Sequence, residues 1–304
     1  MQFSELKNIA RFKDIVTIMA KYGFDEIVQR MELPGAALVR KMTAPGEDMD
    51  VNVRIRCAIE ELGPTFIKFG QVMSLRPDLV PKALLVELAK LQDEVPAIEM
   101  NDLQAVVRES LGMPLDALFS VFDVEPLAAA SLSQVHRAVL KKEGHIVAVK
   151  IQRPGIIKLI QSDLDILDAL AGFLDQKFDE LKAYDLPELV QVIRRQLMKE
   201  IDFTVECRNL EIARALGADT PIHIPRAYSA YCTKKILVME FVPGLSLSRL
   251  MKKLGEPLPL PVAVQIATDV AAGLQFAHEA VDPGTGQPLN LVHRDISPPN
   301  VLLS

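Results

Sequence analysis

The sequence HRDISPPN at residues 293–300 is the stretch from which a fold can be predicted. It follows the apolar pair Leu291-Val292 and precedes the apolar run 301–303, so it forms a short polar loop between two hydrophobic stretches. An aspartate in such a loop can reach an acceptor hydroxyl, while an asparagine five residues later turns inward to hold a metal ion on phosphate groups. We therefore predict that Asp295 is catalytic and that Asn300 binds a metal ion.

The spacing HxDxxxxN is that of the catalytic loop of protein kinases, and a second part of that pattern lies upstream. Residues 147–150, VAVK, end an apolar stretch with a lysine, the arrangement that places an ammonium group over the α- and β-phosphates of ATP. A lysine at the end of a strand is more often a solvated charge, but the kinase-like distance to residues 293–300 favours nucleotide binding. We predict a catalytic role for Lys150 and nucleotide contact for Ala148 and Lys150.

A lysine that binds phosphates needs a carboxylate partner, usually a glutamate on a neighbouring helix. The run EIDFTVE, residues 200–206, contains Asp202 and Glu206 four residues apart, so we expect both on one helical face toward the phosphates. We predict that Glu206 pairs with Lys150 and acts in catalysis. The alternative is a solvated acidic face of a helix.

Residues 238–244, VMEFVPG, have the form of the connector between the two lobes of a kinase, a strand that continues into an extended segment with an exposed backbone. The carbonyl of Glu240 and the amide of Val242 are the predicted contacts of adenine. The alternative is a buried strand that ends at Pro243-Gly244.

Hydrophobic periodicity predicts a helical region followed by strands, then helices, two strands and a further helix. Residues 1 to about 110 repeat apolar side chains every three or four positions, with breaks at prolines and glycines. Predicted strands cover residues 118–124, 134–140, 145–152, 223–231 and 234–242, and predicted helices cover residues 156–182, 187–216 and 262–280.

Residues 128–134, AAASLSQ, stand where a protein kinase has the glycine-rich loop GxGxxG. Alanine allows the backbone to approach a phosphate closely but resists positive φ, so we expect this alanine loop to hold a nucleotide in a different geometry. The predicted nucleotide contacts in it are Ala128, Ala129, Ala130 and Ser131.

With this loop the sequence resembles the UbiB (AarF) family of atypical kinases, and the resemblance covers nearly the whole chain. Three further segments carry it: KFGQ at 68–71, which fits the KxGQ signature, VAVKIQRPGI at 147–156 and EIDFTVECRN at 200–209. One departure is HRDISPPN where the family usually has HADPHPGN, with Ser297 in place of a histidine. With this departure, we expect the preference for a phosphoryl acceptor to differ from that of the family.

The resemblance implies an α+β, protein-kinase-like fold in three parts. They are a helical N-terminal extension with the KxGQ motif at residues 1–112, a complete small lobe with a helical insert at 113–242, and the start of the large lobe at 243–304. The implied cofactors are ATP and Mg²⁺. The sequence ends at Ser304 before any DFG segment, which would carry a further metal-binding aspartate, so whether this chain is itself an enzyme stays open at this point.

Four residues take their predicted roles from the resemblance. Lys68 and Gln71 would point into the active site from the KxGQ segment, Lys68 in catalysis and Gln71 in nucleotide contact. Glu200 and Asp202 would form the metal site together with Asn300.

The resemblance further implies an ATP-dependent kinase or ATPase that acts in ubiquinone or other isoprenoid-lipid metabolism. Its expected partners are a nucleotide, an isoprenoid lipid or quinone precursor, and the surface of a membrane. Two alternatives stand beside it. The HRD form of residues 293–295 is typical of a Ser/Thr protein kinase, and the missing DFG segment is typical of a non-catalytic interaction module.

Composition limits the other classes of function. A net charge of −6 argues against a nucleic-acid-binding protein, because phosphate binding needs concentrated Lys and Arg. Cys57, Cys207 and Cys232 are too far apart in sequence for a CxxC-type metal or redox site, and their scarcity fits a reducing compartment.

The sequence also bears on targeting signals and membrane segments. The N-terminus has scattered charges and no uninterrupted apolar stretch, so we expect no signal peptide. Pro259, Pro261 and Asp269 interrupt the apolar residues 258–278, so we expect no transmembrane helix there. The expected location is the cytoplasm, at the periphery of the membrane.

Overall fold

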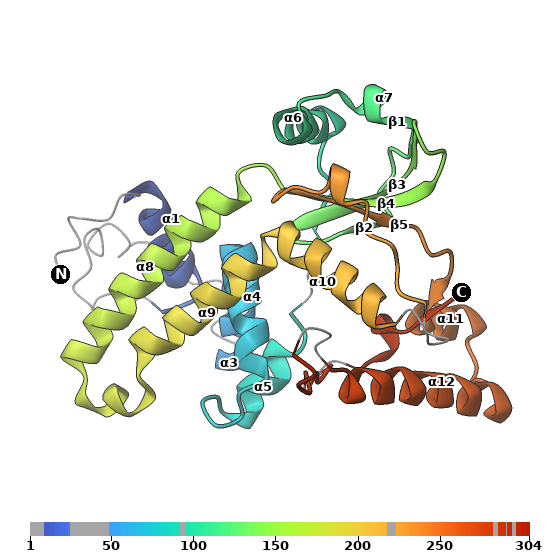
Figure 1. Cartoon of the computed structure of the whole chain (residues 1–304). Coiled ribbons are helices and arrows are strands. Elements are labelled where there is room, and N and C mark those ends of the chain that lie inside the picture. Colours follow the sequence, from blue (N-terminus) through green and yellow to red (C-terminus); the bar gives the residue numbers. More distant parts are fainter. Residues whose placement is uncertain are drawn as a thin grey trace.

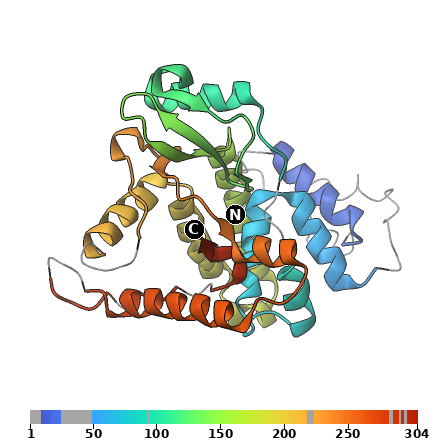
Figure 2. The same ribbon diagram turned by 90° about the vertical axis from the view of Figure 1, so that its right-hand side faces the viewer.

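The computed structural model describes residues 9–24, 49–91, 95–217, 223–281, 285–289, 291–293 and 296–304. Within them a small sheet, a group of long helices and a short C-terminal part lie side by side (Figure 1). The sheet and helix α6 (Met100–Leu111) lie at one end of the molecule. Helix α12 (Leu260–Glu279) lies at the opposite end, as Figure 2 shows. The sheet end carries most of the predicted nucleotide contacts.

The sheet has the strand order β1 (Phe119–Phe122), β3 (Ser133–Leu140), β4 (Ile146–Gln152) and β5 (Ile236–Glu240), and β2 (Ala128–Ala129) pairs with β3. Every pairing is antiparallel. The predicted strands at 118–124, 134–140, 145–152 and 234–242 are confirmed, with somewhat shifted ends. Valine and isoleucine dominate β4 because a central strand covered on both faces favours β-branched side chains.

Helices cover both faces of this sheet. On one face α6 and α7 (Leu115–Leu118) pack side chains such as Val107 against Val149 and its neighbours. On the other face α10 (Phe203–Leu216) packs Phe203 against Leu237. Lys150 lies opposite Leu237 in the strand register, so its side chain points to the face that α10 covers.

The prediction of a strand at residues 223–231 is wrong. The chain makes one antiparallel bridge there, between Ala227 and Met239, and then turns into the 3-10 helix η4 (Ser229–Tyr231). Pro225 has no backbone N–H to donate to a sheet, which keeps the pairing short.

Two predicted helices also differ from the structure. The helix predicted at 187–216 is two helices, α9 (Leu186–Glu200) and α10, which are separated at Ile201-Asp202. The helix predicted at 156–182 is α8 (Ile156–Lys177), followed by the 3-10 helix η3 (Asp179–Tyr184). Periodicity continues across both breaks, so it does not reveal them.

The described part of the N-terminal extension is helical, as predicted. It contains α1 (Ile9–Lys21), α3 (Val51–Leu62), α4 (Pro64–Ser74) and α5 (Lys82–Leu88), and α1 and α4 pack on α8. Nε of Arg11 donates to Oδ1 of the fully buried Asp163 at 2.6 Å. A largely buried ion pair therefore ties α1 to α8.

The C-terminal part begins with β6 (Leu245–Ser246) and α11 (Leu247–Leu254) and ends with the 3-10 helix η5 (Pro298–Asn300) and β7 (Leu302–Leu303). β6 pairs with β7, and the amide of Leu247 donates to the carbonyl of Val301 at 2.8 Å. The residues that follow the predicted catalytic loop therefore lie beside the connector that follows β5.

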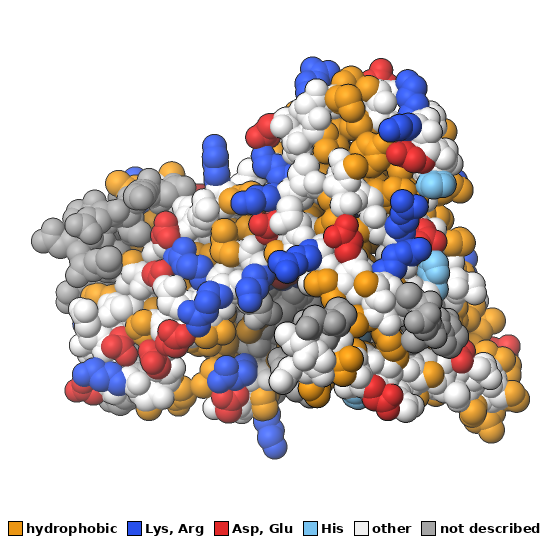
Figure 3. Space-filling model, in the orientation of Figure 1, with side chains coloured by type: hydrophobic (Ala, Val, Ile, Leu, Met, Phe, Trp, Pro, Cys, Tyr) orange, Lys and Arg blue, Asp and Glu red, His pale blue; other side chains and the backbone are white. Residues whose placement is uncertain are grey.

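Helix α12 is long and apolar enough, by length and composition alone, to cross a membrane, and none of its apolar window is buried. Our expectation that the prolines interrupt this stretch is wrong, because Pro259 precedes the helix and Pro261 occupies its first turn, where proline is tolerated. Asp269 lies within the helix, and hydrophobic side chains gather at the surface over α12 (Figure 3). The absence of a transmembrane segment stays a prediction.

Replacing Gly244 by alanine should loosen the pairing of β6 with β7. A Cβ at this position would lie 2.3 Å from the carbonyl oxygen of Leu303, so one of the two backbones has to move. We expect a loss of about 1–3 kcal/mol in the free energy of unfolding, measured in urea. Hydrogen exchange of the Leu247 amide should become faster.

The matched control is Gly273→Ala in α12, where the added Cβ meets nothing within 4 Å. Alanine is the better helix former, so this change should stabilise the protein by roughly 0.5–1 kcal/mol. Gly244→Ala protein as stable as this control would contradict the close approach of Gly244 to Leu303.

Candidate active site

An ion pair between Lys150 and Glu206 stands at the centre of the candidate site. Nζ of Lys150 donates to Oε2 of Glu206 at 2.7 Å and lies 4.8 Å from the ring centroid of the buried Phe203. The ammonium group is thus held between a carboxylate and an aromatic ring. The side chains of Lys150 and Glu206 remain 24% and 41% exposed, so a ligand can reach both.

The local sequence explains why these two side chains meet. Val149 and Ile151 are fully buried, which fixes β4 in the sheet and points Lys150 to the opposite face. Nε2 of Gln152 donates to the carbonyl of Ile201 at 2.7 Å, and this bond holds the junction of α9 and α10 on the end of β4. Glu206 follows in the first turn of α10 and therefore reaches Lys150.

A second ion pair connects the KxGQ segment to the same junction. Nζ of Lys68, on α4, lies 2.9 Å from Oε1 of Glu200, the last residue of α9. Gln71 stands three residues further along α4, and its Nε2 donates to the carbonyl of Leu91 at 3.4 Å. The structure thus brings Lys68 to the predicted metal ligand Glu200 and engages Gln71 with the backbone at the end of the extension.

The prediction that Asp202 and Glu206 share a helical face is wrong. Asp202 is the N-cap of α10, with extended backbone angles, and its Oδ1 accepts from the amide of Thr204 at 3.1 Å. An aspartate at this position satisfies an otherwise unpaired amide at the start of a helix. Sequence spacing alone does not distinguish a cap from the first turn.

The alanine loop adopts no left-handed backbone conformation. Among the described residues other than glycine only Asp185 has positive φ, so residues 128–134 all have negative φ. Ala128 and Ala129 pair with β3, and the amide of Ala130 donates to the carbonyl of Ser133 at 2.8 Å, which closes a tight turn. The side chain of Ser131 is buried, so in this conformation its hydroxyl is not presented to a ligand.

Two predicted adenine contacts, Glu240 and Val242, lie at the end of β5 and just after it. The carboxylate of Glu240 accepts from the amide of Arg226 at 3.1 Å and lies 3.1 Å from Nε2 of His223. The amide of Val242 has no hydrogen-bond partner within the described chain, so it is available as a donor. Ala148, two residues before Lys150, lies on the same face of β4 as the lysine.

The predicted catalytic loop is described only in part. Asp295 lies outside the described residues, and the prediction for it stays a prediction. Asn300 ends η5, where its amide donates to the carbonyl of Ser297 at 2.9 Å. The described residues contain no group of three or more His, Cys, Asp and Glu side chains that could hold a metal ion.

A buried hydrogen-bond chain that we did not predict supports the alanine loop. Nδ1 of His136 lies 2.7 Å from the carbonyl of Asp123, and Nε2 lies 2.7 Å from Nε2 of Gln134. Because a carbonyl only accepts, Nδ1 carries the proton and Nε2 accepts from the Gln134 amide group. Oε1 of Gln134 then accepts from the amide of Ile98 at 2.7 Å. The sequence signal for this chain was the pair of polar residues Gln134 and His136 in strand β3, which is largely buried.

Two of the three cysteines share one apolar cluster. Cys207 on α10 and Cys232 before β5 both pack beside Phe203 and Leu237. Burial raises the pKa of the Cys232 thiol to about 12, and Sγ lies 3.3 Å from the carbonyl of Tyr228. A thiol that stays protonated is a poor nucleophile, so this cluster belongs to the core.

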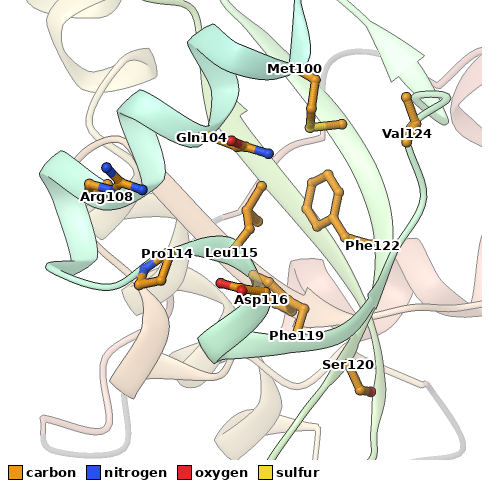
Figure 4. A pocket seen from close by; sticks show the side chains of 10 residues that line it. All are labelled: Met100, Gln104, Arg108, Pro114, Leu115, Asp116, Phe119, Ser120, Phe122 and Val124. Carbon is orange, nitrogen blue, oxygen red and sulfur yellow. The ribbon is translucent and has the colours of Figure 1, made fainter.

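A separate pocket of about 630 Å³ lies on the other face of the small lobe. It is an open pocket between α6, α7 and β1. Gln104 and Arg108 come from α6, and Leu115, Phe119 and Phe122 lie across from them (Figure 4). The predicted site residues are absent from its lining. The Lys150–Glu206 site is therefore formed by other elements than this pocket.

Comparison with known proteins places the chain in a family. Residues 90–258, more than half of the sequence, match the ABC1 atypical kinase-like domain. The chain therefore belongs to the ABC1 atypical kinase-like family. The resemblance to UbiB-type kinases and the predicted protein-kinase-like α+β fold are confirmed at this level. The matched range crosses two predicted domain boundaries, and the division at residues 112 and 242 stays a prediction.

Two relatives illustrate the similarity. A "Probable protein kinase UbiB" of Pectobacterium carotovorum is 34% identical over 81% of this chain and 46% of its own length. An uncharacterized protein from the 5′ region of hydrogenase 1 in Clostridium pasteurianum is 37% identical over 82% of this chain and 44% of its own length. The chain thus spans less than half the length of these relatives.

One solved structure is also similar, the complex of Rv3197 with erythromycin from Mycobacterium tuberculosis. Its sequence identity is 24% and the TM-score is 0.43, over 75% of this chain and 53% of the other.

The buried His136 should make stability depend on pH. Burial lowers the pKa of its imidazole. An unfolded histidine titrates near about 6.5, so below that pH the unfolded chain takes up a proton that the native chain resists. We expect the free energy of unfolding to fall as pH decreases from about 6.5, by up to about 1.4 kcal/mol per pH unit for this group.

Urea unfolding at about pH 7.5 and about pH 5.5 measures this loss. His136→Gln should show a smaller loss between the two values, whereas His145→Gln, at an exposed position, should keep the parent's loss. An unchanged pH dependence in His136→Gln would mean that other groups cause it.

Proposed function

We propose that this protein binds ATP and acts as an atypical kinase or ATPase. The observation that carries the proposal is the Lys150–Glu206 ion pair, which is formed beside the alanine loop at a N–O distance of 2.7 Å. A glutamate that orients a strand lysine is the arrangement with which kinases hold the α- and β-phosphates. Membership of the ABC1 atypical kinase-like family supports the same assignment.

The remaining contacts are assigned from their positions around this pair. Ala148 leaves room for a flat base on the face of β4 that carries Lys150, and the amide of Val242 can donate to adenine. The backbone of residues 128–131 would cover the phosphates. The charge of the phosphates would be met by the ammonium group of Lys150, which Glu206 and Phe203 keep in a single orientation.

Magnesium is part of the proposal, but the described residues do not form its site. Glu200 is paired with Lys68, and Asp202 caps α10, so neither carboxylate is free for a metal ion in this conformation. Carboxylate and amide oxygens are nevertheless the ligands that Mg²⁺ prefers, and Glu200, Asp202 and Asn300 supply that type of donor. These three residues are therefore assigned to the metal ion by the type of their donor atoms alone.

The proposed phosphoryl acceptor or effector is an isoprenoid lipid or quinone precursor, in ubiquinone or related metabolism. Support comes from the resemblance of KFGQ, the alanine loop and EIDFTVECRN to UbiB proteins, and from relatives that bear the UbiB name. The proposed location is the cytoplasm, at the periphery of the membrane. The ion pair of Lys68 with Glu200 favours this type over a Ser/Thr protein kinase, because it fastens the extension to the junction next to the site.

Lys150→Met should abolish most of the nucleotide affinity. The change keeps the length of the side chain but removes the charge that meets the phosphates, and a hydrogen bond between charged groups is worth about 1.5–3 kcal/mol. We expect Mg²⁺-ADP binding, measured by calorimetry, to weaken by about ten-fold or more.

The matched control is Lys235→Met, which removes another ion pair of the small lobe, with Glu109 at 2.8 Å. Its affinity should equal that of the parent. A parent protein that binds no nucleotide, or a Lys150→Met variant that binds as well as the parent, would refute the proposed function.

A further inference from the structure

The segment 95–98, which we call the linker, lies against the alanine loop. The amide of Val95 donates to the carbonyl of Ala129 at 3.4 Å, and the amide of Ile98 donates to Oε1 of Gln134 at 2.7 Å. In the sequence the linker lies between α5 and α6. The loop predicted to cover the phosphates is therefore bonded to a segment from outside the sheet.

Arg153 connects the alanine loop to the linker. Its Nε donates to the carbonyl of Ala130 at 2.7 Å, and its Nη2 donates to the carbonyl of Pro96 at 2.7 Å. Its own amide donates to the carbonyl of Leu132 at 3.0 Å. The planar guanidinium group fixes the directions of these bonds, so it sets the distance between the alanine loop and the linker.

The other end of this connection is held by the KxGQ helix α4. Nε2 of Gln71 donates to the carbonyl of Leu91, and Gly70 packs so closely on Leu91 that a Cβ there would lie 2.4 Å from its Cδ1. Leu91 is buried among side chains of α4 and α5. Contacts at Leu91 thus tie the chain to α4, and contacts at residues 95–98 tie it to the alanine loop.

Helix α4 is therefore linked to both walls of the candidate site. Through Lys68 and Glu200 it is attached to the junction that positions Glu206. Through Gln71, Leu91, the linker and Arg153 it is attached to the alanine loop. A displacement of α4 would change the loop and the ion pair together.

We propose that Arg153 is a positioning residue that couples the alanine loop to the KxGQ extension, so that the extension regulates nucleotide binding. The effect on nucleotide binding rests on the proposed function. The coupling between the alanine loop and the extension does not depend on that function. Coupling of this kind is reciprocal: a nucleotide that fixes the loop also fixes the extension, and a contact that releases the extension weakens nucleotide binding.

A double-mutant cycle on the full chain without nucleotide tests the structural part. The variants are Gln71→Ala, Arg153→Gln and their combination, and the readout is hydrogen exchange of the amides of Leu127 and Ala130, which are bonded within the loop. In the parent background, we expect Gln71→Ala to speed this exchange by about fivefold, which corresponds to the loss of one hydrogen bond. In the Arg153→Gln background it should have no further effect, because the connection is already broken.

Arg153→Lys and Arg195→Gln make the cycle specific. Arg153→Lys keeps the charge but loses the fork, so its loop exchange should resemble that of Arg153→Gln. Arg195→Gln removes an exposed arginine paired with Glu188 and should leave loop exchange unchanged. The coupling would be overturned if Gln71→Ala changed loop exchange equally in the parent and in the Arg153→Gln background. It would also be overturned if Gln71→Ala had no effect on loop exchange in the parent.

Calorimetry with Mg²⁺-ADP then tests the consequence. Arg153→Gln should bind about ten-fold more weakly than the parent, since the side-chain hydrogen bonds to Ala130 in the loop and to Pro96 in the linker are lost. A parent that binds no nucleotide would refute the proposed function, while the exchange cycle would still decide the coupling. Arg153→Gln with parental affinity would refute regulation of nucleotide binding through Arg153.

Discussion

A lysine in a buried central strand imposes the constraint on which the rest of the site depends. Lys150 stands between two fully buried residues of β4, and its partly exposed ammonium group pairs with a carboxylate from outside the sheet. Glu206 supplies it only if α10 begins at the edge of the sheet. Gln152 fixes that start by binding the carbonyl of Ile201, and Lys68 fixes it again through Glu200.

Much of this arrangement could be predicted from residue types with a strict spacing. The strands β3 and β4 follow from their valine and isoleucine pattern, and the pairing of Lys150 with Glu206 follows from the need for a partner. Positions where a hydrogen bond decides between two local structures could not be predicted in this way. Asp202 caps a helix whose start is invisible in the periodicity, and Pro225 limits residues 223–231 to a single bridge.

Residues that act through backbone carbonyls are the least visible in a sequence. Arg153 follows a strand, where a solvated charge is the ordinary expectation, and its role appears only when the carbonyls of Ala130 and Pro96 lie at 2.7 Å. Gln134 and His136 are similar, because their partners are the amide of Ile98 and the carbonyl of Asp123. Backbone groups carry no sequence signal, so only the fold reveals such contacts.

If a nucleotide binds as proposed, side-chain cations matter more beside this alanine loop than beside a glycine-rich loop. Glycines with positive φ can turn successive amides toward a phosphate. In this protein the loop has negative φ throughout, and the amide of Ala130 is already bonded to Ser133. The loop therefore has fewer amides to offer to an anion. In the proposed nucleotide complex the negative charge would then be met by Lys150 and Lys68. Each of these lysines is held in place by a carboxylate at the start of α10 or the end of α9.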